Sequence, residues 1–157
     1  MVPIHPAVVH FPIALLPMAF LLEAIGHFAQ REELRKAAIW LLVVGVVGAW
    51  LAVLTGYLAQ EHASQTVRES RGLELLQLHS KMAYFVAALW SGLLLGRIYL
   101  ERPETERWRT LWLAFAFLGC LLVFFTAYLG GRMVYEFGAG VARPPLSPID
   151  LQGSMPR

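Results

Sequence analysis

The sequence is poor in charged residues and in cysteine. Lys, Arg, Asp and Glu together make up 15% of the 157 residues, against about 25% in an average soluble domain. Thirteen basic and eleven acidic residues leave a formal charge of +2, which excludes a nucleic-acid-binding protein that depends on net charge. The single cysteine, Cys120, excludes an intrachain disulfide. Hydrophobic residues make up 57% of the chain, so the composition indicates an integral membrane protein.

Several catalytic signatures are also missing from the sequence. The chain has no glycine-rich nucleotide-binding loop and no G-x-S-x-G nucleophile elbow. It has no C-x-x-C-H motif, which excludes a covalently attached c-type haem. These absences favour a non-catalytic subunit over an enzyme.

Four apolar segments have the length of a membrane span. A hydrocarbon core of about 30 Å needs about 20 helical residues, and helices satisfy their own backbone polar groups in lipid. No basic residue precedes the first segment and no cleavage motif follows it, so we expect it to be retained. The sequence predicts an all-α integral membrane four-helix bundle over residues 1–141, followed by a Pro-rich extramembrane tail at 142–157. The expected spans are residues 6–28, 37–59, 82–99 and 111–131.

The connections between these spans define two sides of the membrane. The short connections at 30–36 and 101–109 lie on side B, whereas both termini and the polar connection at 60–79 lie on side A. Side B carries seven basic residues in short segments, and side A carries six in longer ones. The positive-inside rule therefore predicts a cytoplasmic side B and a periplasmic side A. A short interfacial helix is expected after Gly72 in the 60–79 connection.

Two short motifs recur along the chain. The pattern H-x-x-x-A opens the first span at His10 and the third at His79, and the pattern T-small-Y-L-small closes the second at Thr55 and the fourth at Thr126. The two spacings, 45 and 47 residues, are nearly equal. We infer two helical hairpins related by a pseudo-two-fold axis along the membrane normal, in which His10 and His79 are equivalent.

Four of the five histidines lie on side A, at positions 5, 10, 62 and 79. Haem in a helix bundle is held by imidazoles from facing helices, so the leading hypothesis makes His10 and His79 the axial ligands of haem b, with Arg132 beside a propionate. Copper or zinc is the alternative cofactor. These metals usually take three or four ligands, which His5 and His62, or the carboxylates of Glu61 and Glu136, would complete.

An acidic residue, Glu23, lies inside the first span four residues before His27. Residues at this spacing share one helix face. The pair is interpreted as a local interaction near the interface, or else as a proton relay or quinone contact.

Residues 5–15 read HPAVVHFPIAL. This segment resembles the H-P-x-x-V-H-F-P-I-A-L opening of domain-of-unknown-function family 2231, small bacterial membrane proteins with four predicted spans. Leu78-His79 is similar to that family's L-H at the third span, and residues 130–141 resemble its closing motif, although members often carry histidine where Phe137 stands here. The resemblance implies a four-span bundle in the bacterial inner membrane, sometimes fused to or found near redox proteins; the haem is inferred from the histidines alone.

Three functions compete at this point. The first is a b-type cytochrome-like subunit that passes electrons between a quinone or a partner and a periplasmic carrier. The second is a structural accessory subunit of a larger membrane complex, and the third is a copper or zinc site for metal handling. In each case we expect contact with membrane lipids, and with other subunits or a second copy of the chain, but not with nucleic acid.

Overall fold

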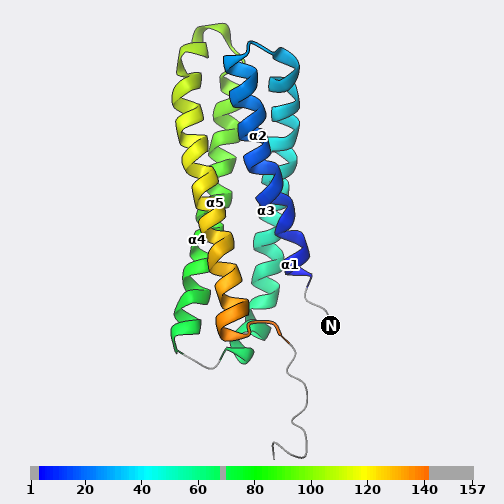
Figure 1. Ribbon diagram of the computed structural model, residues 1–157, viewed down its shortest axis with the longest axis vertical. Helices are drawn as coiled ribbons and strands as arrows, with labels where there is room; N and C mark the ends of the chain where they lie inside the picture. Colours follow the sequence, from blue (N-terminus) through cyan, green and yellow to red (C-terminus); the bar gives the residue numbers. More distant parts are fainter. Residues whose placement is uncertain (1–3, 68–69, 142–157) are drawn as a thin grey trace, which may run out of the picture.

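The computed structural model describes residues 4–67 and 70–141, and within these ranges the chain is helical with no strand. Four long helices run side by side as a bundle, and the two ends of the described chain lie at the same end of it (Figure 1). This arrangement confirms the predicted all-α bundle; the predicted tail at 142–157 lies outside the described residues. The helices are α1 (His5–Val8), α2 (His10–Phe28), α3 (Glu32–Thr66), α4 (Ser70–Tyr99), the 3₁₀ helix η1 (Pro103–Trp108) and α5 (Arg109–Phe137).

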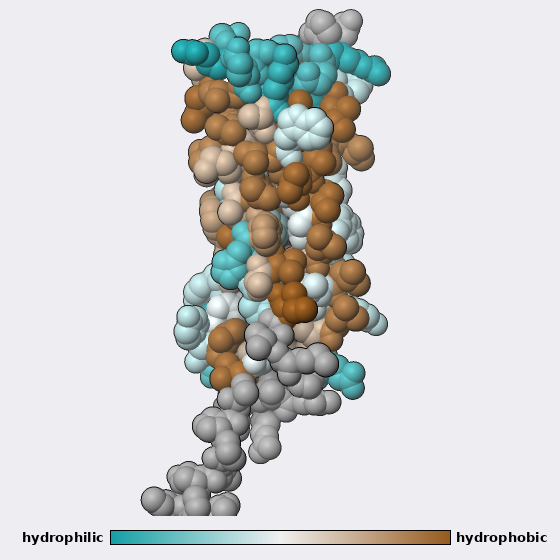
Figure 2. All heavy atoms as spheres, turned by 90° about the vertical axis from the view of Figure 1, so that its right-hand side faces the viewer, coloured by the Kyte–Doolittle hydropathy of each residue, from teal (hydrophilic) through white to brown (hydrophobic). Residues whose placement is uncertain are grey.

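Four helical segments are long and apolar enough to cross a membrane. Only 22% to 39% of each apolar window is buried inside the bundle, so most of its apolar surface faces outward. Figure 2 shows this surface as a broad apolar band with a hydrophilic cap at the side B end. The chain is therefore a multi-pass membrane protein. The four segments are His5–Phe28, Glu32–Glu61, Ser70–Tyr99 and Thr105–Phe137.

The first membrane-spanning segment, His5–Phe28, is the first rod of the bundle, and it is divided into α1 and α2 at Val9. Pro12 has no backbone N–H, so it cannot donate the helical hydrogen bond to the carbonyl of Val8, the last residue of α1. Helix α5 ends differently: Gly138 takes the left-handed conformation with φ 65°, and its N–H bonds the carbonyl of Val134 at 3.0 Å.

The middle connection is shorter than the sequence predicted. Helix α3 continues to Thr66 and α4 begins at Ser70, so most of the segment at 60–79 is helical rather than a long polar loop. The separate interfacial helix expected after Gly72 belongs to the first turns of α4. These extra turns have polar outer faces and pack around a small apolar core of their own. Its buried members are Leu75, Leu76, Leu129 and Met133.

The main core lies within the apolar band and is centred on large side chains. Trp90 is fully buried there and Leu16 and Ala116 are equally inaccessible. Helix α3 approaches the first rod through glycines, because a Cβ on Gly48 would lie 3.4 Å from Pro12 and one on Gly56 would lie 2.9 Å from the His5 ring. The small residues of α3 thus let the first rod, including His5, pack closely against it.

Candidate functional site

Two histidines on side A are each held across a pair of helices. His5, the first residue of α1, has its Nδ1 3.1 Å from the Thr55 hydroxyl oxygen on α3. His79 on α4 has its Nδ1 3.0 Å from the backbone carbonyl oxygen of Thr126 on α5. Each imidazole therefore bridges the two helices of its own hairpin.

The hydrogen bonds determine which ring nitrogen carries the proton. A carbonyl oxygen only accepts, so Nδ1 of His79 must donate to Thr126. The Thr55 hydroxyl lies 2.9 and 3.1 Å from the carbonyls of Leu51 and Ala52; when it gives its single proton to one of them, its oxygen accepts from Nδ1 of His5. In both neutral rings Nε2 is then the unprotonated nitrogen with a free lone pair.

Glycines make room for both imidazoles. A Cβ on Gly56 would lie 2.9 Å from Cε1 of His5, and one on Gly130 would lie 3.2 Å from Cε1 of His79. These separations are shorter than ordinary carbon–carbon contacts, so any larger residue would displace the ring. The two halves of the chain thus use a similar construction: a histidine whose Nδ1 contacts a threonine, through the hydroxyl of Thr55 in one half and the backbone carbonyl of Thr126 in the other, and a glycine behind the ring.

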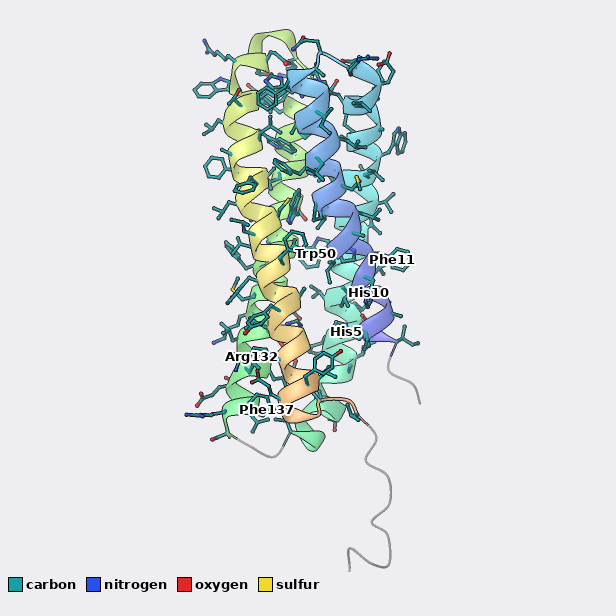
Figure 3. All side chains as sticks on the ribbon, viewed as in Figure 1. His5, His10, Phe11, Trp50, Arg132 and Phe137 are labelled. Carbon is teal, nitrogen blue, oxygen red and sulfur yellow. The ribbon has the colours of Figure 1, made fainter. Side chains whose placement is uncertain are left out.

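The structure matches His79 with His5 rather than with His10. His10 begins α2, its side chain is exposed, and its Nδ1 lies 2.5 Å from the Pro6 carbonyl oxygen (Figure 3). The T-small-Y motifs mark the threonines that the imidazoles contact, and the histidine that contacts Thr55 is His5, five residues before the His10 that the sequence pattern pairs with His79. The division of the rod at Val9 leaves His5 facing α3, where Gly56 admits it.

His5 packs against α3 and His79 against α5, and among the described residues no hydrogen bond or ring contact joins the two imidazoles. Among the residues that the structure describes, no group of three or more His, Cys, Asp or Glu side chains could hold a metal ion. The side chain of His62 lies outside the described part, and Glu61 is exposed. Side A of the described structure therefore holds one oriented imidazole in each hairpin.

Arg132 is engaged with a residue of its own helix. Its Nε and Nη2 donate to the two carboxylate oxygens of Glu136, both at 2.7 Å, and its guanidinium lies over the Tyr128 ring. Glu136 is exposed and Arg132 is half-buried near the side A end of α5 (Figure 3). The sequence predicts Arg132 beside a haem propionate, or Glu136 as a metal ligand. Either role requires the ion pair between the two side chains to open.

A second polar cluster lies at the side B end, and its centre is Glu23. This carboxylate is 1% exposed, and its two oxygens contact Nη1 of Arg109 at 2.5 Å and Nε of Arg97 at 2.8 Å. Both guanidinium groups are also buried. Helices α2, α4 and α5 are thus joined by one carboxylate within the apolar band.

Further ion pairs connect Glu23 and its two arginines to partly exposed residues at the side B end of the bundle. Glu106 accepts hydrogen bonds from Nε and Nη2 of Arg109 at 2.8 and 2.7 Å. Arg35 on α3 lies 3.4 Å from Glu106 and 3.9 Å from Glu23. We call the set of Glu23, Arg35, Arg97, Glu106 and Arg109 the side B ion cluster.

The predicted partner of Glu23, His27, is not in contact with it. Nδ1 of His27 instead lies 3.7 Å from a Glu106 oxygen. Arg97 and Arg109 form ion pairs with the two oxygens of Glu23, so the cluster connects three helices. Local spacing could not reveal this, because the two arginines lie 74 and 86 residues away in the sequence.

Comparison with known proteins places the chain in a family without assigning it an activity. No curated protein and no solved structure matches it. A family model described as a predicted membrane protein, domain of unknown function 2231, matches residues 1–143. The four apolar helices and the matched length agree with that description, and the chain accordingly belongs to this family.

Proposed function

We propose that this protein binds haem b through Nε2 of His5 and Nε2 of His79 and carries electrons as a non-catalytic membrane subunit. The observation that supports this most directly is the fixed tautomer of both rings, with Nδ1 hydrogen-bonded to Thr55 or Thr126 and Nε2 left free. Ligating histidines are typically oriented by just such a hydrogen bond from the other ring nitrogen. When bound, haem supplies reversible one-electron chemistry.

The number of donors favours haem over copper or zinc. Haem iron needs only two axial ligands from the protein, whereas zinc and copper sites usually take three or four. Each hairpin holds one oriented imidazole, and the described residues contain no group of three or more His, Cys, Asp or Glu side chains that could hold a metal ion. Two histidine ligands would also leave no open position for a substrate, which agrees with electron transfer rather than catalysis.

The chain's own residues would hold the cofactor in a defined way. Thr55 and the Thr126 carbonyl orient the imidazoles and increase the basicity of Nε2. Gly56 and Gly130 leave the rings space. Arg132 remains the proposed propionate partner, and it would exchange the Glu136 carboxylate for that of the haem.

The proposed location is the bacterial inner membrane with side A in the periplasm. Among the described residues, exposed cations are more frequent at the opposite end, on both short connections of side B and the adjoining turns. By the positive-inside rule this end is cytoplasmic. These side B cations are Arg31, Lys36, Arg102 and Arg107.

Absorption spectra of the purified, tag-free protein, oxidised and dithionite-reduced, test the proposal. We expect a Soret band and a sharp α band on reduction, both lost in His5→Ala and in His79→Ala. The matched controls are His10→Ala, whose ring is exposed, and His27→Ala on side B; both should retain the spectrum. Loss of haem in His10→Ala would instead restore the pairing predicted from the sequence.

The same preparation separates the competing functions. A colourless protein expressed with ample haem contradicts the proposal. If it contains stoichiometric copper or zinc, metal handling replaces electron transfer. If it contains no metal and elutes only within a larger complex, a structural accessory role replaces it.

A substitution of Thr55 tests how His5 is positioned. Thr55→Val removes the hydroxyl that accepts the Nδ1–H of His5, so we expect haem affinity to fall about 10- to 100-fold, measured by haem titration of the apoprotein. Thr55→Ser keeps a hydroxyl and should restore most of the affinity. Equal affinity in all three proteins would mean that this hydrogen bond does not orient the ligand.

A further inference from the structure

The connection between α2 and α3, at the side B end of the bundle (Figure 1), borders a hollow on the molecular surface. The hollow has a volume of about 490 Å³ and is open rather than enclosed. Sites for small ligands measure about 300–1,000 Å³, so this volume admits a ligand of that size. Three of the lining residues are apolar and two carry opposite charges, which suits an amphipathic ligand. They are Ile25, Ala29, Leu34, Arg31 and Glu33.

The turn that carries the charged edge of the hollow is fixed by hydrogen bonds. The backbone N–H of Arg31 donates to the Gly26 carbonyl at 2.8 Å. Gln30 takes the left-handed conformation with φ 54°, and its side-chain amide donates to the His27 carbonyl at 2.7 Å. The two helices also meet closely, because a Cβ on Gly26 would lie 2.7 Å from Cγ of Arg35. The hollow is therefore formed by the fold itself, and a ligand needs no rearrangement of the turn.

The two charged side chains of the hollow have no partner within the described part of the chain. Arg31 and Glu33 are both exposed, and no hydrogen bond or ion pair joins either side chain to another described residue. The neighbouring Glu32, in contrast, lies 3.4 Å from Arg35 in an ion pair. A cation and an anion that stand unpaired in one hollow can each bind one charge of a zwitterionic ligand.

The hollow lies at the level of the lipid head groups. Three exposed aromatic residues at this end, Trp40, Tyr99 and Trp108, are of the kind that gathers at a membrane–water interface. Gly26 packs against Arg35, which is five residues, about 8 Å, outward from Trp40 along α3. The head-group layer extends about 5–8 Å beyond the hydrocarbon core on each side. The charged edge of the hollow is thus among the head groups, and its apolar part borders the acyl chains.

Apolar side chains continue from the hollow toward the middle of the membrane. On α2, Leu21 lies one turn further in than Ile25, and the two are 47% and 51% exposed. On α3, Ala37 and Leu41 follow Leu34 at helical spacing. Figure 2 shows the apolar band directly beneath the hydrophilic cap of this end. A ligand in the hollow therefore meets charges at one end and apolar surface at the other, as a phospholipid requires.

From these observations we propose that the hollow binds one molecule of phosphatidylethanolamine from the side B leaflet. The Arg31 guanidinium donates hydrogen bonds to the lipid phosphate, an acceptor that matches its geometry. The Glu33 carboxylate accepts a hydrogen bond from the lipid ammonium, and the acyl chains lie along Ile25 and Leu34. The site is at the opposite end of the bundle from His5 and His79, so the proposal is independent of the haem.

The same chemistry distinguishes this lipid from others. The quaternary nitrogen of phosphatidylcholine has no N–H, so it cannot donate to the Glu33 carboxylate. Phosphatidylglycerol has no ammonium at all, and it would leave Glu33 unpaired near a phosphate of the same sign. We therefore expect the ethanolamine lipid to bind more tightly than either of these.

Lipid binding to the full chain, counted by native mass spectrometry from detergent micelles, tests the proposal. The probes are phosphatidylethanolamine, phosphatidylcholine and phosphatidylglycerol with identical acyl chains. We expect the ethanolamine lipid to bind about fivefold more tightly than the other two, the effect of one exposed charge pair. Equal binding of all three lipids, or tightest binding of phosphatidylglycerol, would overturn the proposal.

Substitutions assign the two charges to their roles. Arg31→Gln should weaken binding of both the ethanolamine and the choline lipid about fivefold. Glu33→Gln should reduce the preference for ethanolamine over choline to less than about twofold. The matched controls are Glu32→Gln and Arg102→Gln, which remove exposed charges outside the hollow and should leave binding unchanged. Equal losses in the controls would mean that charge anywhere on side B suffices, and would refute the site.

Filling the hollow tests its position. Ala29→Trp places an indole within it, so binding of phosphatidylethanolamine should fall at least fivefold, whereas Glu32→Trp, one residue from the hollow, should bind normally. Unchanged binding in Ala29→Trp would place the lipid elsewhere. Glycerophosphoethanolamine, the same head group without acyl chains, should compete at least a hundredfold less well, because it lacks the apolar contacts. Competition at equal concentration would show that a soluble phosphoester, and not a lipid, is the ligand.

Discussion

Replacing Glu23 with glutamine is expected to destabilise the bundle by about 3–5 kcal/mol, because it removes the charge that compensates two buried guanidinium groups. Arg97 and Arg109 are each at most 1% exposed, and Glu23 contacts both. The amide of glutamine offers one acceptor oxygen and no charge. The two cations would remain buried within the apolar band with only the partly exposed Glu101 and Glu106 as partners.

Unfolding of the purified protein in detergent, followed by helical signal against denaturant or temperature, measures the effect. Glu136→Gln is the matched control: it also removes a carboxylate from an arginine pair, but Glu136 is exposed and Arg132 is only half-buried. A surface pair of this kind contributes well under 1 kcal/mol. If the two variants unfolded alike, the side B ion cluster would not hold the helices together as its geometry indicates.

The cluster also shows where reasoning from the sequence ends. Glu23 was recognised as unusual because it interrupts an apolar segment, and that rule needs no structure. Its partners come from helices α4 and α5, which lie more than 70 residues away in the sequence. A pattern based on neighbouring residues could propose only His27, the one ionisable residue at helical spacing.

The sequence predicted the helical segments that are apolar and long enough to cross the lipid. Apolar length identified four spans, and the structure has four such helices. The sequence did not predict the extra helical turns of α3 and α4 between residues 60 and 79, because these turns carry charged residues on their outer faces and only a narrow apolar stripe inside. Leu75, Leu76 and Met133 form that stripe across two helices, so it becomes visible as a core only after the helices are paired.

The histidine site was likewise predictable only in part. The repeated threonine motifs located the level at which both imidazoles are held, because Thr55 and Thr126 occupy matching positions in two similar hairpins. The choice between His5 and His10 depended on how the first rod passes Pro12, which hydropathy and spacing do not encode. Gly56 was the one signal available: a small residue beside the threonine indicates that a large group packs against it.

Truncation of Trp90 is expected to have an effect comparable with the loss of Glu23. Its indole is fully buried in the main core and lies against Gly119, where a Cβ would be only 3.1 Å from the ring. Trp90→Ala should cost about 3–5 kcal/mol, because the helices can close only part of the cavity that it leaves. Detergent unfolding again provides the measurement, and Trp40→Ala, which removes an indole that is 72% exposed, should change stability by only about 0.5 kcal/mol.

A second substitution at this position separates packing from polarity. Nε1 of Trp90 is buried without a hydrogen-bond partner among the described residues, so the indole contributes through its volume and not through its N–H. Trp90→Phe keeps most of that volume and removes the unpaired donor, so its cost should stay below about 1.5 kcal/mol. A phenylalanine variant as unstable as the alanine variant would show that the N–H has a partner, such as a buried water, and that the centre of the bundle is polar as well as packed.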